Sequence, residues 1–136
     1  MISQKEIILN EYSRGFHLIT EEIVRQLPQL PETGLLNLFI RHTSCALSVC
    51  ENWDPEVRAD MERIYDHLVK ERQPYYRHVL EGDDDMPAHA KTVLTGVSIN
   101  VPVTHGRLNF GTWQGIYLCE FRNDGGRRHI IATAVG

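Results

Sequence analysis

The stretch VSINVPV (residues 97–103) decides the fold class, because its apolar side chains recur at every second position. This alternation places them on one face of an extended strand. Working outward, similar patterns predict further strands at residues 5–9, 35–40, 45–50, 108–110, 113–121 and 129–135. The run at 35–40 is almost entirely apolar, which is typical of a strand covered on both faces. The last strands are predicted to form an antiparallel meander.

Three helices are predicted between these strands, over residues 20–27, 54–68 and 87–95. Thr20 is the expected N-cap of the first helix. Asp54 caps the second, where Pro55 takes the first helical position. Asp85 is a candidate N-cap for the third, and Gly96 ends it. The sequence therefore predicts an α+β fold, a mostly antiparallel two-layer sheet sandwich with about three helices, in one domain spanning residues 1–136.

Composition excludes several classes of function. Lysine and arginine number 14 against 18 acidic residues, which gives a net charge of −4 and no basic surface for nucleic acid. No apolar run reaches the length of a membrane span, and the first residues lack the pattern of a signal peptide. The three cysteines have no CxxC spacing and lie in apolar segments, so we expect reduced thiols in a cytoplasmic protein.

The stretch HVLEGDDDMPAH (residues 78–89) concentrates residues that bind metals. Adjacent carboxylates repel one another and lose solvation when buried, so they favour either water or a nearby cation. His78 and His89 flank the acidic run, and neutral imidazoles ligate transition metals. His42 follows the strand at 35–40 on its inward face. We predict these three histidines as ligands of a divalent metal, zinc or alternatively magnesium. The competing interpretations are core histidines bonded to the backbone and a solvated acidic helix start.

Four carboxylates are candidate catalytic groups. Asp84 and Asp85 lie beside the predicted metal ligands. Glu51 follows the strand at 45–50. Glu120 interrupts an apolar strand, and a buried carboxylate needs a partner. It either orients a ligand histidine or forms a structural ion pair with a nearby arginine.

Five further residues are candidate substrate contacts. Thr112, Trp113 and Gln114 lie between two glycines, in a turn where a ligand can approach the backbone. Trp113 can stack on a planar heterocycle such as a pyrimidine, although a packing role is an equal alternative. Arg41 and Arg127 belong to local arginine groups that suit an anionic ligand such as a phosphate.

Four segments together resemble the YjbQ-like family, whose members are described as secondary thiamine-phosphate synthases. They are HTSCAL (42–47), ENWDP (51–55), the 78–89 stretch and GTWQGIYLCE (111–120). The resemblance covers essentially the whole chain. It implies a trimeric α+β fold and weak thiamine-phosphate synthase activity.

Three functions remain open at this level. The resemblance implies an enzyme that joins a pyrimidine pyrophosphate to a thiazole phosphate. A histidine-rich metal site instead suits a hydrolase of a small phosphate or amide compound. The third alternative is a non-catalytic trimer that binds a metal or a metabolite. The expected partner is a small phosphorylated metabolite rather than nucleic acid or membrane.

Overall fold

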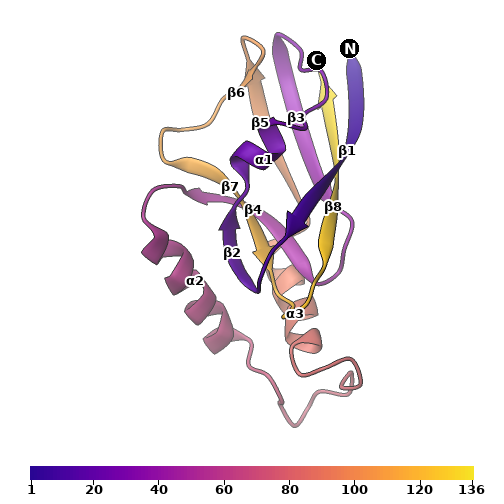
Figure 1. The fold of residues 1–136 in the computed structure, drawn as a ribbon, viewed down its shortest axis with the longest axis vertical. Coiled ribbons are helices and arrows are strands. Elements are labelled where there is room, and N and C mark those ends of the chain that lie inside the picture. The colour runs from indigo at the N-terminus through magenta and orange to yellow at the C-terminus, as the bar shows by residue number, and fades with distance from the viewer.

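Two antiparallel sheets and three helices make up residues 1–136 of the computed structural model (Figure 1). One sheet has five strands in the order β1-β8-β3-β5-β6, and the other has three in the order β2-β7-β4. The strands are β1 (Ile2–Glu11), β2 (Gly15–Leu18), β3 (Thr33–Ile40), β4 (Cys45–Glu51), β5 (Ser98–Thr104), β6 (Arg107–Leu108), β7 (Gln114–Glu120) and β8 (Arg127–Val135). The helices are α1 (Thr20–Val24), α2 (Pro55–Leu68) and α3 (Asp85–Thr95). The predicted α+β class and antiparallel sheets are confirmed.

The main core lies between the two sheets. In β3, Leu36, Leu38 and Ile40 are at most 1% exposed and face it. Leu35 and Phe39, on the other face of the same strand, are 50% and 46% exposed. The prediction that this strand is covered on both faces is therefore wrong, because an apolar run does not reveal whether its second face has a covering layer within the chain.

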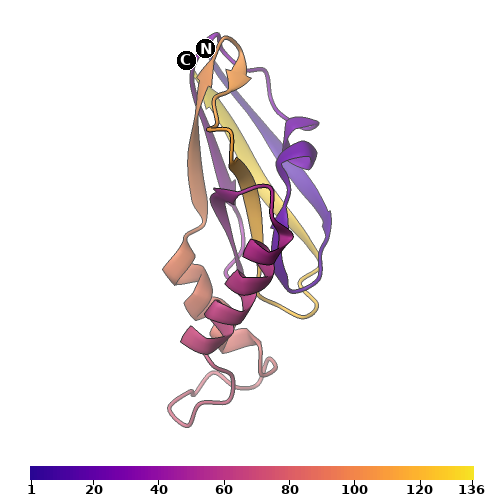
Figure 2. The ribbon, with the colours of Figure 1, turned by 90° about the vertical axis from the view of Figure 1, so that its left-hand side faces the viewer.

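The three-stranded sheet is the layer that is covered on both sides. Ile116 and Leu118 of β7 join the core between the sheets, whereas Tyr117 and Cys119 face a second core. Met61 and Tyr65 of α2 pack against that second core, and Ala88 of α3 is part of it. The order of layers is thus five-stranded sheet, three-stranded sheet and helices α2 and α3, and in Figure 2 helix α2 is nearest the viewer. Ile23 of α1 instead belongs to the core between the sheets. No helix is both long and apolar enough to cross a membrane.

The predicted C-terminal meander is wrong, because consecutive strands β7 and β8 belong to different sheets. β7 lies between β2 and β4, and β8 lies between β1 and β3. The turn at 121–126 carries the chain from one layer to the other, with Gly126 at φ +70°. Strand β2 was not predicted, since it is only four residues long.

The helix starts follow the sequence only in part. Asp54 caps α2 as predicted, by accepting a hydrogen bond from the backbone N–H of Glu56 at 2.9 Å. Thr20 is not an N-cap, because its hydroxyl instead accepts from the N–H of Ile116 in β7. Asp85 is the first residue of α3 rather than its cap, which frees its carboxylate for other partners.

Candidate functional site

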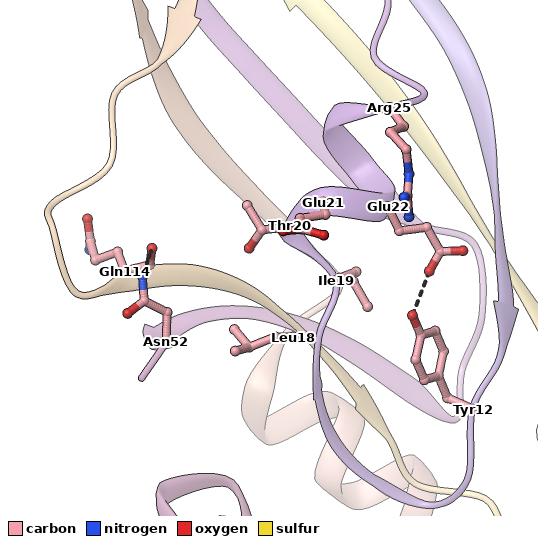
Figure 3. A pocket seen from close by; sticks show the side chains of 9 residues that line it. All are labelled: Tyr12, Leu18, Ile19, Thr20, Glu21, Glu22, Arg25, Asn52 and Gln114. Carbon is pink, nitrogen blue, oxygen red and sulfur yellow. Dashed lines mark hydrogen bonds between the residues drawn. The ribbon is translucent and has the colours of Figure 1, made fainter. Parts of the chain in front are cut away.

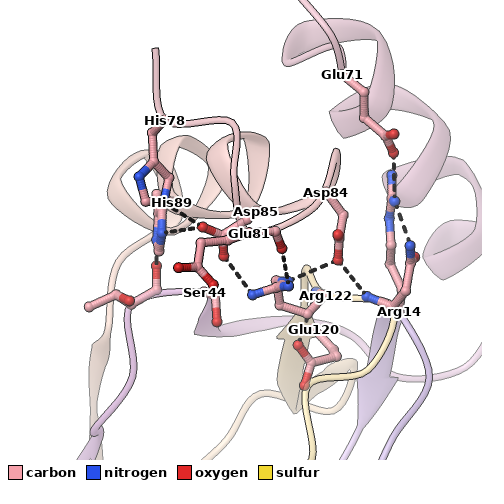
Figure 4. Close-up of polar contacts among 12 residues, drawn as sticks. Arg14, Ser44, Glu71, His78, Glu81, Asp84, Asp85, His89, Glu120 and Arg122 are labelled. Atoms are coloured by element: carbon pink, nitrogen blue, oxygen red, sulfur yellow. Dashed lines mark hydrogen bonds and ion pairs between the residues drawn. The ribbon is translucent and has the colours of Figure 1, made fainter. Parts of the chain in front are cut away.

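Three side chains meet at the start of α3. Asp85 and His89 lie one turn apart on the helix, so they share a face, and His78 comes from the preceding loop. Asp85 Oδ2 is 2.6 Å from His78 Nε2 and 3.1 Å from His89 Nε2 (Figure 4). One ligand atom from each residue lies within 4.8 Å of the others, a grouping that can hold a metal ion. Of the three histidines predicted to converge, His78 and His89 do so.

Both ring nitrogens of His89 face hydrogen-bond acceptors. Its Nδ1 lies 2.8 Å from the backbone carbonyl of Thr43, and its Nε2 faces the carboxylate of Asp85. Both partners are acceptors, but a neutral imidazole donates through only one nitrogen. When Nδ1–H bonds Thr43, either a proton or a metal ion must lie between Nε2 and Asp85. A ligand histidine that donates its second N–H to a carbonyl is the usual arrangement in metal sites.

A metal ion fits this donor set. Two ligands of a tetrahedral zinc at about 2.1 Å from the ion lie about 3.4 Å apart. The observed separations of 2.6 and 3.1 Å therefore need only a small outward movement of the side chains. His78 is half exposed and sits in a loop, so its ring can make this movement. Two imidazoles and one carboxylate favour a transition metal over magnesium.

Arg122 holds the two buried aspartates of the site in place. Its Nη1 donates to Asp85 Oδ1 at 2.5 Å, its Nε to Asp84 Oδ2 at 2.9 Å and its Nη2 to the carbonyl of Glu81 at 3.0 Å. Burial alone would raise the pKa of Asp85, but the hydrogen bond from His78 and the charges of His89 and Arg122 outweigh it and lower the pKa. Asp85 is therefore ionised and ready to ligate a cation.

Asp84 has a supporting role in this arrangement. Its Oδ2 also accepts from the backbone N–H of Asn123 at 2.9 Å, so it ties α3 to the turn after β7. Burial alone would raise the pKa of Asp84, but the hydrogen bonds from Asn123 and Arg122 outweigh burial and lower the pKa below its ordinary value. It is not part of the metal-ligating group, and its predicted catalytic role stays a prediction.

His42 was predicted as the third metal ligand, but the third member of the group is Asp85. The Nε2 of His42 accepts a hydrogen bond from the backbone N–H of His129 at 2.9 Å, as the core-histidine interpretation expects. Burial and the charges of Arg128 and His129 lower its pKa, so its ring is neutral. His42 and His89 nevertheless line one open cavity of about 600 Å³, with the apolar side chains of Val93 and Val97.

Glu120 forms the structural ion pair that was its alternative interpretation. It is 0% exposed, and its oxygens accept from Arg128 Nε at 2.7 Å and Nη2 at 2.6 Å. Arg128 also donates to the hydroxyl of Ser44 at 3.0 Å. Glu120 bonds no ligand histidine, so the orienting role predicted for it is wrong. A strand buried on both faces must neutralise its one carboxylate inside the protein.

Glu51, Thr112, Trp113 and Gln114 lie together, but away from the metal-ligating group. β4 begins beside Thr43 and His89 and ends at Glu51, and its seven residues span about 20 Å. Asn52 donates from its side chain to the carbonyls of Thr112 and Gln114 at 3.2 and 3.1 Å. Within one chain these residues therefore form a separate surface.

The predicted anion-binding arginines are dispersed. Arg41 pairs with Glu6 at 3.2 Å on the exposed face of the five-stranded sheet. Arg127 donates from Nε to the carbonyl of Leu9 at 2.9 Å, next to β1. The other arginines of the same turn form the internal pairs described above. The structure thus provides no arginine cluster for a phosphate.

The sequence did not point to two groups of the site, the side chain of Arg122 and the backbone carbonyl of Thr43. Nothing in the sequence linked Arg122 to Asp85, 37 positions earlier, and the Thr43 carbonyl gave no signal because every residue carries one. The i, i+4 spacing of Asp85 and His89 on a helix was the available signal for the third ligand.

Known proteins match this chain along nearly its full length. The family model described as UPF0047 protein YjbQ-like matches residues 5–136. The UPF0047 protein YjbQ of Salmonella typhimurium is 54% identical over 135 residues, covering 98% of this chain and 97% of that protein. The UPF0047 protein YugU of Bacillus subtilis is 41% identical over 96 residues, covering 68% and 70%.

Solved structures agree with the fold. The crystal structure of the conserved hypothetical protein TT1486 of Thermus thermophilus superposes with a TM-score of 0.81 at 35% identity, covering 97% of this chain and 99% of that one. A YjbQ/UPF0047 protein of Clostridium acetobutylicum gives 0.78 at 29%, covering 97% and 99%. The chain belongs to the UPF0047 family of YjbQ-like proteins.

Proposed function

We propose that the chain is a metal-dependent enzyme in which His78, Asp85 and His89 bind one divalent transition metal. The observation that carries this proposal is the meeting of three ligand atoms within 4.8 Å around a carboxylate that is nearly buried. Three protein ligands leave coordination positions for water and substrate, as in catalytic rather than structural sites. Zinc suits this donor set, and the same set suits iron(II).

The donor set favours hydrolysis of a small phosphate or amide compound. A bound metal of this kind lowers the pKa of a coordinated water to about 7 and polarises a substrate oxygen. The chain's own residues position the site: the carbonyl of Thr43 fixes the ring of His89, and Arg122 fixes Asp85. The open cavity beside His89 gives a substrate access to the exposed side of the group.

The second candidate is the coupling reaction that the family resemblance implies. It joins a pyrimidine pyrophosphate to a thiazole phosphate with release of pyrophosphate. The exposed ring of Trp113 suits a planar heterocycle. Within one chain it lies away from the metal-ligating group, so it supports this candidate only if the assembly of copies brings the two surfaces together. Arg122 and Arg128 are already bonded to carboxylates inside the chain, so a metal rather than these arginines must neutralise the leaving group.

One assay separates these functions. The purified protein is loaded with zinc or iron(II) and given the pyrimidine pyrophosphate alone, the thiazole phosphate alone, or both. Pyrophosphate release that requires both substrates indicates coupling, and phosphate or pyrophosphate release from one substrate indicates hydrolysis. Tight metal binding without turnover of these compounds or of a panel of small phosphate and amide substrates would contradict an enzymatic function and favour the non-catalytic alternative.

A homotrimer is the assembly that the family resemblance predicts, and the bare face of the five-stranded sheet supports association. Leu35 pairs in register with Val135, and Phe39 with Ile131. Leu35, Phe39 and Val135 are 46–50% exposed, and helices α2 and α3 pack on the other sheet. An exposed apolar sheet face is typical of an interface between copies of a chain.

A further inference from the structure

Two tryptophans form the most exposed aromatic pair linking separate segments of the fold. Trp53 follows β4 and is 77% exposed, and Trp113 precedes β7 and is 61% exposed. Their ring centroids are 6.4 Å apart, and the ring planes meet at 76°. The faces of two nearly perpendicular rings form the walls of a corner that opens to solvent. Indole faces carry a negative quadrupole, so such a corner attracts cations.

The backbone holds this corner in place without help from the indole rings. Asn52 bonds the carbonyls of Thr112 and Gln114 through its side chain, and its N–H donates to the carbonyl of Trp113 at 3.0 Å. The Glu51 carboxylate accepts from the N–H groups of Trp53 and Asp54. Both segments are therefore fixed before any ligand arrives, which reduces the entropic cost of binding. Both indoles remain largely exposed.

The charge around the corner is mostly negative. Glu51, Asp54 and Glu56 flank Trp53, and residues 109–115 around Trp113 carry no charge. The basic residue nearest to Trp53 along the chain is Arg58, which lies against Tyr117 with its Nη1 buried. The carboxylates of Glu51 and Asp54 already accept backbone N–H groups. They attract a cation through their field, but they do not offer the set of free oxygens that a small metal ion requires.

A cleft beside the corner gives room for the rest of a ligand. Asn52 and Gln114 form one edge of an open cavity of about 470 Å³, and Glu21, Glu22 and Arg25 lie across it (Figure 3). Glu22 is saturated by the N–H of Asn10 and the hydroxyl of Tyr12, whereas Glu21 makes no side-chain hydrogen bond. This wall carries two carboxylates against one guanidinium, so it continues the acidic character of the corner.

We propose that Trp53 and Trp113 form a binding site for an organic cation of the quaternary ammonium class, with Glu51 and Asp54 providing the opposing charge. Such a cation is large and weakly hydrated, so it gains from aromatic faces and from a nearby negative field without needing direct coordination. A neutral apolar ligand would gain from the rings but not from the carboxylates. The site is separate from the metal-ligating group and independent of the metal chemistry proposed above.

Intrinsic fluorescence tests the proposal directly, because these two residues are the only tryptophans in the chain. Metal-free protein is titrated with choline at constant ionic strength, and with its neutral isostere 3,3-dimethylbutan-1-ol. We expect a saturable change in emission with choline and at least a five-fold weaker response to the alcohol. Equal responses to both would overturn the proposal in favour of a plain apolar patch. If the emission changed on dilution of the protein but not on addition of choline, the proposal would be overturned in favour of a contact with a second copy of the chain.

Variants test separately whether choline binding depends on the indole rings and on the nearby carboxylates. Trp113→Leu leaves Trp53 as the reporter, and we expect choline affinity to fall roughly five-fold. The double variant Glu51→Gln with Asp54→Asn keeps one acceptor oxygen on each side chain but removes two charges, so affinity should fall by a similar factor and lose its dependence on salt. Glu11→Gln, at the end of β1, is the matched charge control and should bind choline as the unmodified protein does. Unchanged affinity in the double variant would contradict the assigned role of the carboxylates.

Discussion

Arg122 holds one oxygen of the Asp85 carboxylate at 2.5 Å, while the other oxygen of the same group faces His78 and His89. The guanidinium thus fixes the orientation of the carboxylate without occupying the oxygen that faces the histidines. It also competes with a metal for the negative charge of Asp85. If the proposed metal binds here, its affinity therefore depends on a residue that follows Asp85 by 37 positions in the sequence.

Replacing Arg122 with glutamine should weaken zinc binding about 10- to 100-fold, as is typical when a residue that orients a metal ligand is lost. Calorimetric titration of zinc into the metal-free protein measures this change. Arg63→Gln is the control, because Arg63 is exposed on α2 and pairs only with Asp60. Equal zinc affinities in the Arg122 variant and the unmodified protein would show that Asp85 needs no such support.

Asp85→Asn should reduce zinc binding by more than the Arg122 variant does, because it removes a charged ligand rather than its support. His89→Ala should do the same. Elemental analysis after dialysis against a fixed zinc concentration gives the stoichiometry of each protein. His105→Ala is the control, since His105 is exposed and contacts only Glu32. Retention of one zinc per chain in both ligand variants would place the metal elsewhere.

The stability of the metal-free protein should decrease in acid through Asp84. Its pKa lies below the ordinary value of 3.8 in the folded chain, so the folded state binds fewer protons than the unfolded one. The stabilisation is complete above that ordinary value and is lost as the pH falls through the folded value. Asp84→Asn should cost about 1–3 kcal/mol at pH 7, and the gap from the unmodified protein should close below pH 3.8. Urea unfolding with a chelator present, from pH 7 to pH 2, measures both. A gap that persists unchanged to pH 2 would rule out this carboxylate as its source.

Glu120→Gln should reduce the free energy of unfolding by about 3–5 kcal/mol, because Arg128 is then buried without a counter-charge. The double variant Glu120→Leu with Arg128→Met removes both charges and should recover most of that loss. Urea unfolding of the three proteins gives the comparison. If the single variant were as stable as the unmodified chain, the ion pair would have no structural role and Glu120 would again be a catalytic candidate.

Phe39→Glu should produce a monomer if the bare sheet face is the surface of a homotrimer. The charge would be buried between copies without a partner, while the monomer tolerates it because Phe39 is 46% exposed. Light scattering coupled to size-exclusion chromatography reports the mass of each protein. Lys5→Glu, on the edge strand β1, is the control. A monomeric unmodified chain at micromolar concentration would contradict the trimer.

The sequence determined those features that depend on neighbouring residues. Alternation of Leu36, Leu38 and Ile40 placed one face of β3 inward, and Asp54 with Pro55 located the start of α2. The acidic stretch likewise brought His78 and His89 to one place, because only eleven positions separate them and a helix start lies between. Such local features follow from side-chain period and backbone conformation alone.

Only the tertiary structure decided which strands pair and which distant groups meet. The sequence predicted β7 and β8 as neighbours, but the turn between them crosses from one sheet to the other. That crossing brings Arg128 back onto Glu120 and carries Arg122 to Asp85. Periodicity reports which face of a strand is apolar, but it contains no information on which layer will cover that face. Contacts between residues far apart in the chain form only when the layers pack, so the arginine that supports Asp85 became visible only in the folded molecule.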